Sequence, residues 1–498
     1  MIDFLTQTPT ASLYLSAIGG YLLFLLAISA YKSRRINTQD DFMVAGRNVS
    51  TLFLAGTLVC TWIGAGSLFG GAGRAFREGF SALWMSAGAW AGIAFCYFLA
   101  HRVRKLTQYT VPDIIEMRYT PTARLLTTIA IVLAYLTIAG YQFVGAGRLL
   151  NLLTGIEPIY GQLLTCGLVI LYTALAGMMS IVALDIFNGL LITGGVLVAA
   201  PFALRSAGGW SSVVETLPDT HFSVFGSLGL LPALGLFLPT LFLLLGESSM
   251  YQKFMSARDG ASAKRAVIGM ILGVIVIEIA LDATAIFGAA IYWNNPDFVS
   301  SDGMFQAQAT ETILLQVARY NLPPLVGVFL AVGAAAIIFS TATTFLLIPS
   351  TNIIRDIYQR FVCPEANESN LIRAQRGVVV GLALLAVATS SMFESVLDMA
   401  LYAYTMVGAA VTPALLGAFL WKRATAAGGT ASVTLGISIT IIYATLNALG
   451  VTDLDYDFII YPAGGASIAA LIIVSLLTPP PPESKWRPFW GGSHAMDD

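Results

Sequence analysis

Charged residues are scarce in this chain. Only 11% of its 498 residues are Asp, Glu, Lys or Arg, against roughly 25% in a soluble domain, whereas 57% are hydrophobic and the mean hydropathy is +0.77. This composition excludes an ordinary soluble domain and predicts an all-α integral membrane protein whose surroundings are a lipid bilayer. The formal net charge is −2 and there is no basic tract, so nothing indicates nucleic acid as a partner.

Histidine and cysteine are also scarce. The three histidines fall at a helix end, in a loop and in the tail, so they offer neither a His-based triad nor a metal cluster within the membrane, and we expect no enzyme. The four cysteines have no CxxC spacing, which indicates small buried side chains rather than redox chemistry. No basic n-region precedes the first apolar run, so we expect that run to be retained.

Long apolar runs are abundant. A scan for about 20 apolar residues, the length that crosses a bilayer as a helix, predicts 13 transmembrane helices. Their approximate limits are 12–31, 50–75, 80–101, 124–152, 158–177, 179–204, 228–254, 263–294, 324–354, 372–392, 396–421, 425–449 and 458–477. Residues 111–119 resemble a short amphipathic helix on the inner surface, and residues 478–498 are too polar and Pro-rich to span or to pack as a helix.

Basic residues fix the expected orientation. With 13 spans, 21 of the 26 Lys and Arg residues fall on one side of the membrane, Lys253 among them, and that side should be cytoplasmic. The other five are Arg74, Arg77, Arg148, Arg205 and Arg319. We therefore expect the N-terminus outside and the C-terminus inside, in a plasma (inner) membrane.

Two predicted spans are interrupted. Residues 64–73 contain five glycines inside span 2, and an unwound helix in a bilayer is tolerated where its backbone lines a cavity or binds something. The alternative is a glycine seam for close helix packing. Span 7 is interrupted by Pro232, Gly235, Pro239 and Gly246.

Spans 2 and 7 are five helices apart, so a repeat that starts at span 7 enters the membrane from the opposite face. This spacing predicts a 5+5 inverted repeat. Its parts are a first helix and loop at 1–49, repeat 1 at 50–204, repeat 2 at 205–421, peripheral spans at 422–477 and a cytoplasmic tail at 478–498.

Span 9 carries hydroxyls in its middle. Ser340, Thr341 and Thr344 share a face with Ile337 at helical spacing. With carbonyls from an unwound span 2, they could complete a shell of neutral oxygens suited to sodium. The alternative is that these hydroxyls bond within their own helix or join neighbouring helices.

Five segments together resemble the sodium:solute symporter family. They are 61–70 (TWIGAGSLFG), 111–119 (VPDIIEMRY), 176–185 (AGMMSIVALD), 251–258 (YQKFMSAR) and the stretch 334–358. The resemblance covers about residues 15–477 and implies the leucine-transporter fold. It also implies a secondary active transporter that imports a small organic solute by sodium symport with alternating access.

The resemblance carries the family's sodium site onto five residues. They are the carbonyls of Cys60, Ile63 and Ile337 and the hydroxyls of Ser340 and Thr341. Some family members hold a further sodium, which here implies Asp185, Ser340, Thr343 and Thr344. Asp185 is also a functional hypothesis by itself, because a carboxylate within a membrane span is costly.

The resemblance places the solute beside the break in span 2. The residues expected to contact it are Trp62, Gly64, Ser67 and Gln142. A quaternary-ammonium cage needs several aromatic side chains, but Glu247 and Ala400 stand where others would be expected, which disfavours choline. Gly66 and Ser67 disfavour a sugar, and an amino acid or carboxylate remains.

Two other classes stay open. A proton-coupled carrier of the same fold would use a titrating carboxylate, Asp185 or Glu278, in place of the ion. A transport-like membrane sensor would need an output domain, for which the short tail gives no room.

Overall fold

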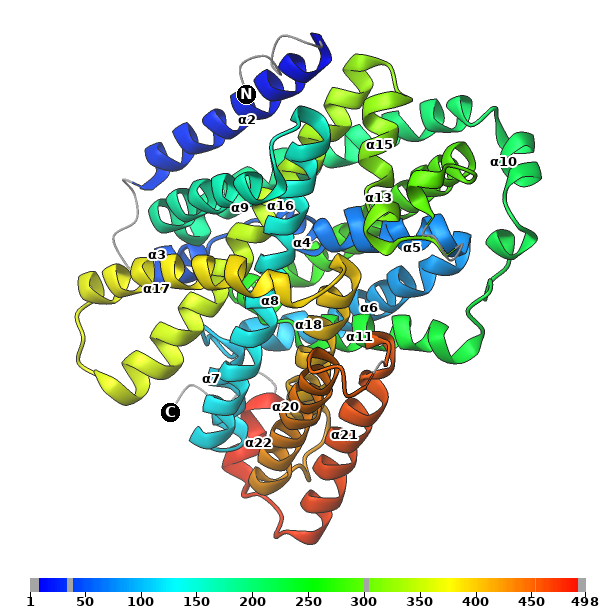
Figure 1. Cartoon of the computed structure of the whole chain (residues 1–498). Helices are drawn as coiled ribbons and strands as arrows, with labels where there is room; N and C mark the ends of the chain where they lie inside the picture. The colour runs from blue at the N-terminus through cyan, green and yellow to red at the C-terminus, as the bar shows by residue number, and fades with distance from the viewer. Residues whose placement is uncertain (1–8, 34–38, 300–303, 453, 491–498) are drawn as a thin grey trace.

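The computed structural model describes residues 9–33, 39–299, 304–452 and 454–490, which form helices joined by short loops (Figure 1). Eleven of these helices are long and apolar enough to cross a membrane, and two further apolar helices are shorter, Thr51–Trp62 and Pro158–Ala174. The all-helical membrane fold is therefore confirmed. The total of 13 spans stays a prediction, because the two shorter helices coincide with predicted spans 2 and 5.

The first half of the helical body begins with a broken helix. Its elements are α4 (Thr51–Trp62), a π-helix (Gly66–Gly71), α5 (Ala72–Glu78), α6 (Leu83–Lys105), α7 (Val111–Arg118), α8 (Pro121–Thr154) and α9 (Pro158–Ser206). Within α9, Gly177 is non-helical with φ 54° and ψ −169°, so two helices meet there at the predicted boundary of spans 5 and 6. A Cβ at Gly177 would lie 2.8 Å from the Phe42 ring, which leaves room for glycine alone.

The second half also begins with a broken helix. Its elements are α11 (Leu230–Gly246), α12 (Ser248–Ser256), α13 (Gly260–Tyr292), α16 (Pro324–Asn352), α17 (Glu368–Thr389), α18 (Val396–Ala410) and α19 (Thr412–Leu420). The break falls at Glu247, which is extended (φ −70°, ψ 109°), while Pro239 is accommodated inside α11. Both halves thus interrupt their first helix, in the order that the sequence predicts.

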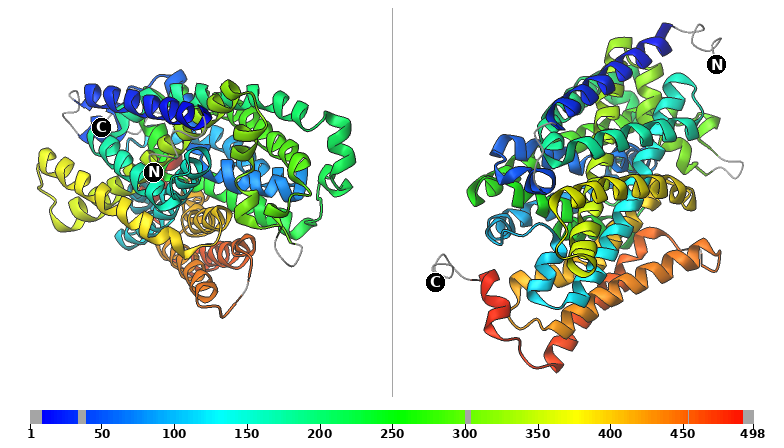
Figure 2. Two further views of the ribbon diagram at one scale, coloured as in Figure 1. Left: turned by 45° about the horizontal axis from the view of Figure 1, so that its top comes forward. Right: turned by 90° about the vertical axis from the view of Figure 1, so that its left-hand side faces the viewer.

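Three helices flank this body. The first helix α2 (Pro9–Ser33) lies along one side, and the hairpin of α20 (Ala426–Ala448) and α21 (Ile460–Leu477) lies along the opposite side, as Figures 1 and 2 show. The prediction that the tail does not pack as a helix is wrong: α22 (Glu483–Trp490) packs Phe489 against Phe419. Although the segment is mostly polar, it contains three aromatic residues within five positions, Trp486, Phe489 and Trp490, and Phe489 is buried.

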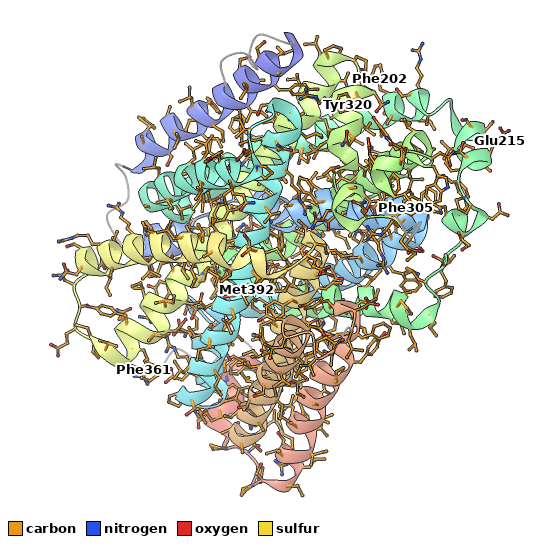
Figure 3. The ribbon with its side chains drawn as sticks, viewed as in Figure 1. Phe202, Glu215, Phe305, Tyr320, Phe361 and Met392 are labelled. Atoms are coloured by element: carbon orange, nitrogen blue, oxygen red, sulfur yellow. The ribbon has the colours of Figure 1, made fainter. Side chains whose placement is uncertain are left out.

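Large apolar side chains cover much of the outer surface. Phe202, Tyr320, Phe361 and Met392, which are labelled in Figure 3, are between 36% and 65% exposed. By contrast, α8, α16 and α18 are mostly buried and form the centre of the molecule. An apolar exterior around a buried helical centre is what a bilayer-embedded protein requires.

Candidate ion and solute site

The break after α4 frees backbone groups at the centre of the molecule. Ile63 follows Trp62 in an extended conformation (φ −70°, ψ 129°), so the regular helix ends before the glycines begin. The side chain of Gln142 in α8 holds the break in place, because its Oε1 accepts the Ala65 N–H at 2.8 Å. Three of the glycines lie in the π-helix, and Gly70 packs tightly there: a Cβ at Gly70 would lie 3.2 Å from the Leu397 backbone. The segment is therefore both a packing seam and a source of unwound backbone.

Three oxygens converge where this break meets α16. The Thr341 hydroxyl lies 3.0 Å from the Cys60 carbonyl oxygen and 2.9 Å from the Ile63 carbonyl oxygen. A hydroxyl has one proton and can donate to one carbonyl at a time, so the cluster holds more lone pairs than protons. All three residues are at most 2% exposed. A small cation would satisfy these oxygens better than the single proton does.

The other two residues of the expected sodium set lie on the same helix. Ile337 is fully buried one turn before Thr341. Ser340 is next to Thr341, but its hydroxyl donates to Asp185 Oδ1 at 2.5 Å instead of facing the Cys60 carbonyl. The structure thus brings Cys60, Ile63 and Thr341 together and leaves Ser340 turned toward α9.

Asp185 lies at the junction of α4, α9 and α16. It is 1% exposed, accepts hydrogen bonds from Ser340 and Thr57, and its backbone carbonyl accepts the Cys60 thiol at 2.8 Å. Of the other residues expected at a further sodium, Thr343 donates to the Ser340 carbonyl at 2.7 Å. The buried Thr344 hydroxyl has no hydrogen-bond partner among the described residues.

Lys253 lies at the centre of the molecule, where the sequence analysis did not place it. It was counted among the cytoplasmic basic residues, but α12 carries it into the core, where it is 0% exposed. Its ammonium donates to the Thr57 carbonyl at 3.0 Å and to the Thr61 hydroxyl, and lies 4.0 Å from Asp185 Oδ2. The signal was available, because Lys253 lies inside the predicted limits of span 7.

The residues expected to contact solute separate into two groups. Trp62 and Ser67 line a small cavity beside the π-helix. Gly64 instead packs against Gln142 and Thr341, since a Cβ there would lie 2.8 Å from Gln142 Nε2 and 3.1 Å from Thr341 Cγ2. Gln142 is fully buried, and its Nε2 has no partner among the described residues.

Aromatic and acidic side chains that the sequence analysis did not connect surround Trp62. Its indole N–H donates to Glu278 Oε1 at 2.7 Å, and Trp90 donates to Glu278 Oε2 at 2.7 Å. The ring of Tyr404 in α18 lies 6.0 Å from the Trp62 ring, centroid to centroid. Span 11 thus brings an aromatic side chain to Trp62 through Tyr404, one turn after Ala400.

An ionic cluster ties the two halves together away from this centre. Arg124 at the start of α8 pairs with Asp113 at 2.6 Å, with Glu116 at 2.6 Å and with Asp356, beyond α16, at 2.5 Å. The pKa of Glu116 is lowered: burial raises it, but the hydrogen bonds from Arg360 and Arg124 outweigh burial. Two of the sequence segments that carry the family resemblance, 111–119 and 334–358, thus meet in one contact.

The chain is similar to known proteins over most of its length. The family model described as "Sodium:solute symporter family" matches residues 42–436. The high-affinity proline transporter PutP of Bacillus subtilis is 25% identical over 464 residues, covering 90% of this chain and 94% of the relative. A sodium/proline symporter of Staphylococcus aureus is 23% identical over 444 residues, covering 86% of this chain and 84% of the relative.

Two solved structures share the fold. A Na+-coupled sialic acid symporter in a substrate-bound outward-open state superimposes with a TM-score of 0.77 at 19% identity, covering 94% of this chain and 98% of that one. MhsT in complex with L-phenylalanine gives a TM-score of 0.56 at 14% identity, covering 86% and 98%. These likenesses confirm the leucine-transporter fold that the sequence predicts.

Proposed function

Because this chain belongs to the sodium:solute symporter family, we propose that the ion of its transport cycle binds where the break after α4 meets α16. The chain is a multi-pass membrane protein and a sodium-coupled solute symporter that works by alternating access. The proposed ion ligands are the carbonyls of Cys60, Ile63 and Ile337 and the hydroxyls of Ser340 and Thr341. Sodium is a transported substrate here and not a resident cofactor.

The convergence of three oxygens around one hydroxyl proton carries this proposal. Thr341 faces both the Cys60 and the Ile63 carbonyl oxygens within 3.0 Å. A sodium ion bound among them would connect α4 of the first half to α16 of the second. Since the connection holds the two halves in one relative arrangement, occupancy of the site changes which arrangement is favoured.

Ion binding and solute binding are then coupled in both directions. If sodium tightens the solute by some factor, the solute tightens sodium by the same factor. The membrane potential adds about 2.3 kcal/mol per elementary charge per 100 mV to the sodium concentration gradient. The solute therefore moves inward with the ion.

A double substitution tests the ion site. Ser340→Ala with Thr341→Ala should raise the sodium concentration needed for half-maximal uptake into proteoliposomes. The matched control is Thr440→Ala in α20, whose buried hydroxyl bonds to the Gly436 carbonyl of its own helix at 2.8 Å. Unchanged sodium dependence in the double variant, with protein that folds and transports, would remove the assignment.

A further sodium is proposed at Asp185, Ser340, Thr343 and Thr344. The Ser340 hydroxyl on Asp185 and the unpartnered Thr344 hydroxyl support this set. Lys253 opposes it, because its ammonium already stands 4.0 Å from Asp185 Oδ2. We therefore propose that a second ion binds only when Lys253 moves away from Asp185.

The solute is proposed to be a small organic molecule that enters beside the break. Trp62, Gly64, Ser67 and Gln142 remain the proposed contacts, and the cavity lined by Trp62 and Ser67 supports the first and third of them. Since several relatives are proline transporters, proline is the first solute to test. Sodium-stimulated uptake of a radiolabelled panel into proteoliposomes identifies the solute.

Topology and location are part of the proposal. We place the N-terminus outside and the C-terminus in the cytoplasm of a plasma membrane, with repeats at 50–204 and 205–421, and we propose transport with no enzymatic step. A single cysteine introduced at exposed Glu215 should react with an impermeant maleimide in intact cells, whereas one introduced at exposed Arg265 should react only after the membrane is permeabilised. The reversed labelling pattern would overturn the orientation.

A further inference from the structure

The cavity beside Trp62 differs from the ion site in its chemistry. It is enclosed by the π-helix, α6, α13 and α18, and has a volume of about 20 Å³, room for roughly one water-sized group. A whole solute therefore needs the walls to separate, but one small functional group fits as they stand. The lining shows which group that is.

Two carboxyl groups face this cavity from one side of α13. Glu278 is 4% exposed, and both its oxygens are occupied by indole N–H groups, from Trp62 and Trp90. Asp282, one helical turn later, is 6% exposed and has no hydrogen bond or ion pair within the described part of the chain. A buried carboxyl group without a partner stays charged only at a cost, and a cation that donates an N–H to Asp282 would remove that cost.

No described side chain of the cavity wall carries a positive charge that could pair with Asp282. The described lining contains no Lys, Arg or His. The lysine of the core, Lys253, belongs to the other cluster, where it contacts the Thr57 carbonyl and lies 4.0 Å from Asp185. The two acidic side chains therefore favour a positively charged group that arrives from outside the protein.

The aromatic side chains of the cavity suit the same group. The rings of Trp62 and Tyr404 lie 6.0 Å apart and are inclined at 34°, and both line the cavity. Aromatic faces attract an ammonium through their quadrupole, most strongly when water is excluded. A carboxylate in this position would instead be repelled by the two acidic side chains.

We propose that this cavity receives the protonated amine of the transported solute, with Asp282 accepting its N–H, Glu278 adding negative charge, and Trp62 and Tyr404 packing against it. The inference rests on the proposed function and specifies the solute class. A primary or secondary ammonium fits better than a quaternary one, because Asp282 needs an N–H donor. Glu278 is a positioning residue, held by two indoles and orienting Trp62.

Four probes built on a five-membered ring test which charge of the solute the cavity binds. Pyrrolidine carries only the ammonium, L-proline carries both charges, cyclopentanecarboxylate carries only the carboxylate, and N,N-dimethylproline is quaternary. The readout is the shift of the thermal unfolding midpoint of the purified full chain in sodium chloride, with potassium chloride as reference. We expect pyrrolidine and proline to stabilise the protein and cyclopentanecarboxylate to have no effect.

Substitutions then locate the contact. Asp282→Asn should raise the pyrrolidine concentration needed for half-maximal stabilisation about 10- to 100-fold, as expected for loss of a charge-assisted hydrogen bond. Asp282→Glu should retain part of the response, Tyr404→Phe should retain more of it than Tyr404→Leu, and the exposed control Asp297→Asn should match the unchanged protein. A stabilising effect of sodium alone in each variant shows that it is folded.

The outcomes distinguish this inference from the proposed function. If sodium does not shift the unfolding midpoint of the unchanged protein, the proposed function is overturned. A sodium response with equal or stronger stabilisation by cyclopentanecarboxylate, no stabilisation by any amine, or an amine response unaffected by Asp282→Asn overturns the inference alone.

Discussion

Lys253 gives the sharpest quantitative prediction. Its ammonium is fully buried, 4.0 Å from Asp185 Oδ2, and it is held by the Thr57 carbonyl and the Thr61 hydroxyl. At 4 Å and an effective dielectric constant of about 20, two unit charges attract by about 4 kcal/mol. Removing one partner of a buried pair costs about 3–5 kcal/mol, because the other charge stays buried alone. Lys253→Met should therefore lose stability of this order in sodium-free buffer.

Sodium should restore part of this loss. With Lys253 removed, Asp185 and the Ser340 hydroxyl are available to a cation, and a ligand at 100 times its Kd stabilises a protein by about 2.7 kcal/mol. Thermal unfolding of purified protein in potassium chloride and in sodium chloride measures both effects. The sodium-induced shift of the midpoint should be larger in Lys253→Met than in the unchanged protein.

Matched variants separate this effect from a general loss of stability. Lys253→Arg keeps the charge in a larger side chain and should lose less stability than Lys253→Met, and Lys105→Met removes an exposed lysine and should have little effect. The reasoning is refuted if Lys253→Met is as stable as the unchanged protein in potassium chloride and responds to sodium no more strongly.

Three further predictions follow from other contacts. Gly64→Ala places a Cβ 2.8 Å from Gln142 Nε2, so overpacking of about 1–3 kcal/mol should raise the sodium concentration for half-maximal uptake by about fivefold or more, whereas Gly20→Ala, which meets nothing within 4 Å, should not. Arg124→Met leaves the buried Asp356 carboxylate without its partner and should lower the thermal midpoint, and adding Asp356→Asn should recover part of the loss. Burial lowers the pKa of His221 below 6.5, so the folded state favours the neutral ring; this contribution to stability is complete above pH 6.5 and is lost as the pH falls through the lower folded-state pKa. His221→Gln should flatten the decline of the unfolding midpoint between pH 7.5 and 5, and an unchanged decline would contradict this reading.

Sequence patterns predicted the architecture well because membrane helices follow local rules. Apolar length located the helices, and glycine and proline marked both interrupted ones. The break in span 7 lies at Glu247, directly after the predicted interruption at Gly246, whereas Pro239 stays inside α11, because proline removes only one backbone donor and the helix accommodates it. The short helix Glu483–Trp490 was missed for the opposite reason: burial of Phe489 against Phe419 outweighs poor local propensity.

The candidate site could be predicted only in part. Hydroxyls at helical spacing indicated Ser340 and Thr341, but which carbonyls they face depends on how α4 and α16 cross. Lys253 lay inside the predicted limits of span 7, but the sequence did not show which side chains of α4 and α9 surround it. The pairing of Trp62 with Glu278 and Tyr404 joins residues more than 120 positions apart, and no spacing rule reaches that far.

Direct sodium binding tests the central claim, that the ion lies among the Cys60 and Ile63 carbonyls and the Thr341 hydroxyl. Binding of radioactive sodium to the purified protein should weaken in Thr341→Val, which keeps the shape and removes the oxygen. Removing one protein oxygen that contacts a bound cation costs about 1.5–3 kcal/mol, which lowers the affinity about 10- to 150-fold. Sodium affinity in Thr341→Val equal to that of the unchanged protein would contradict the account.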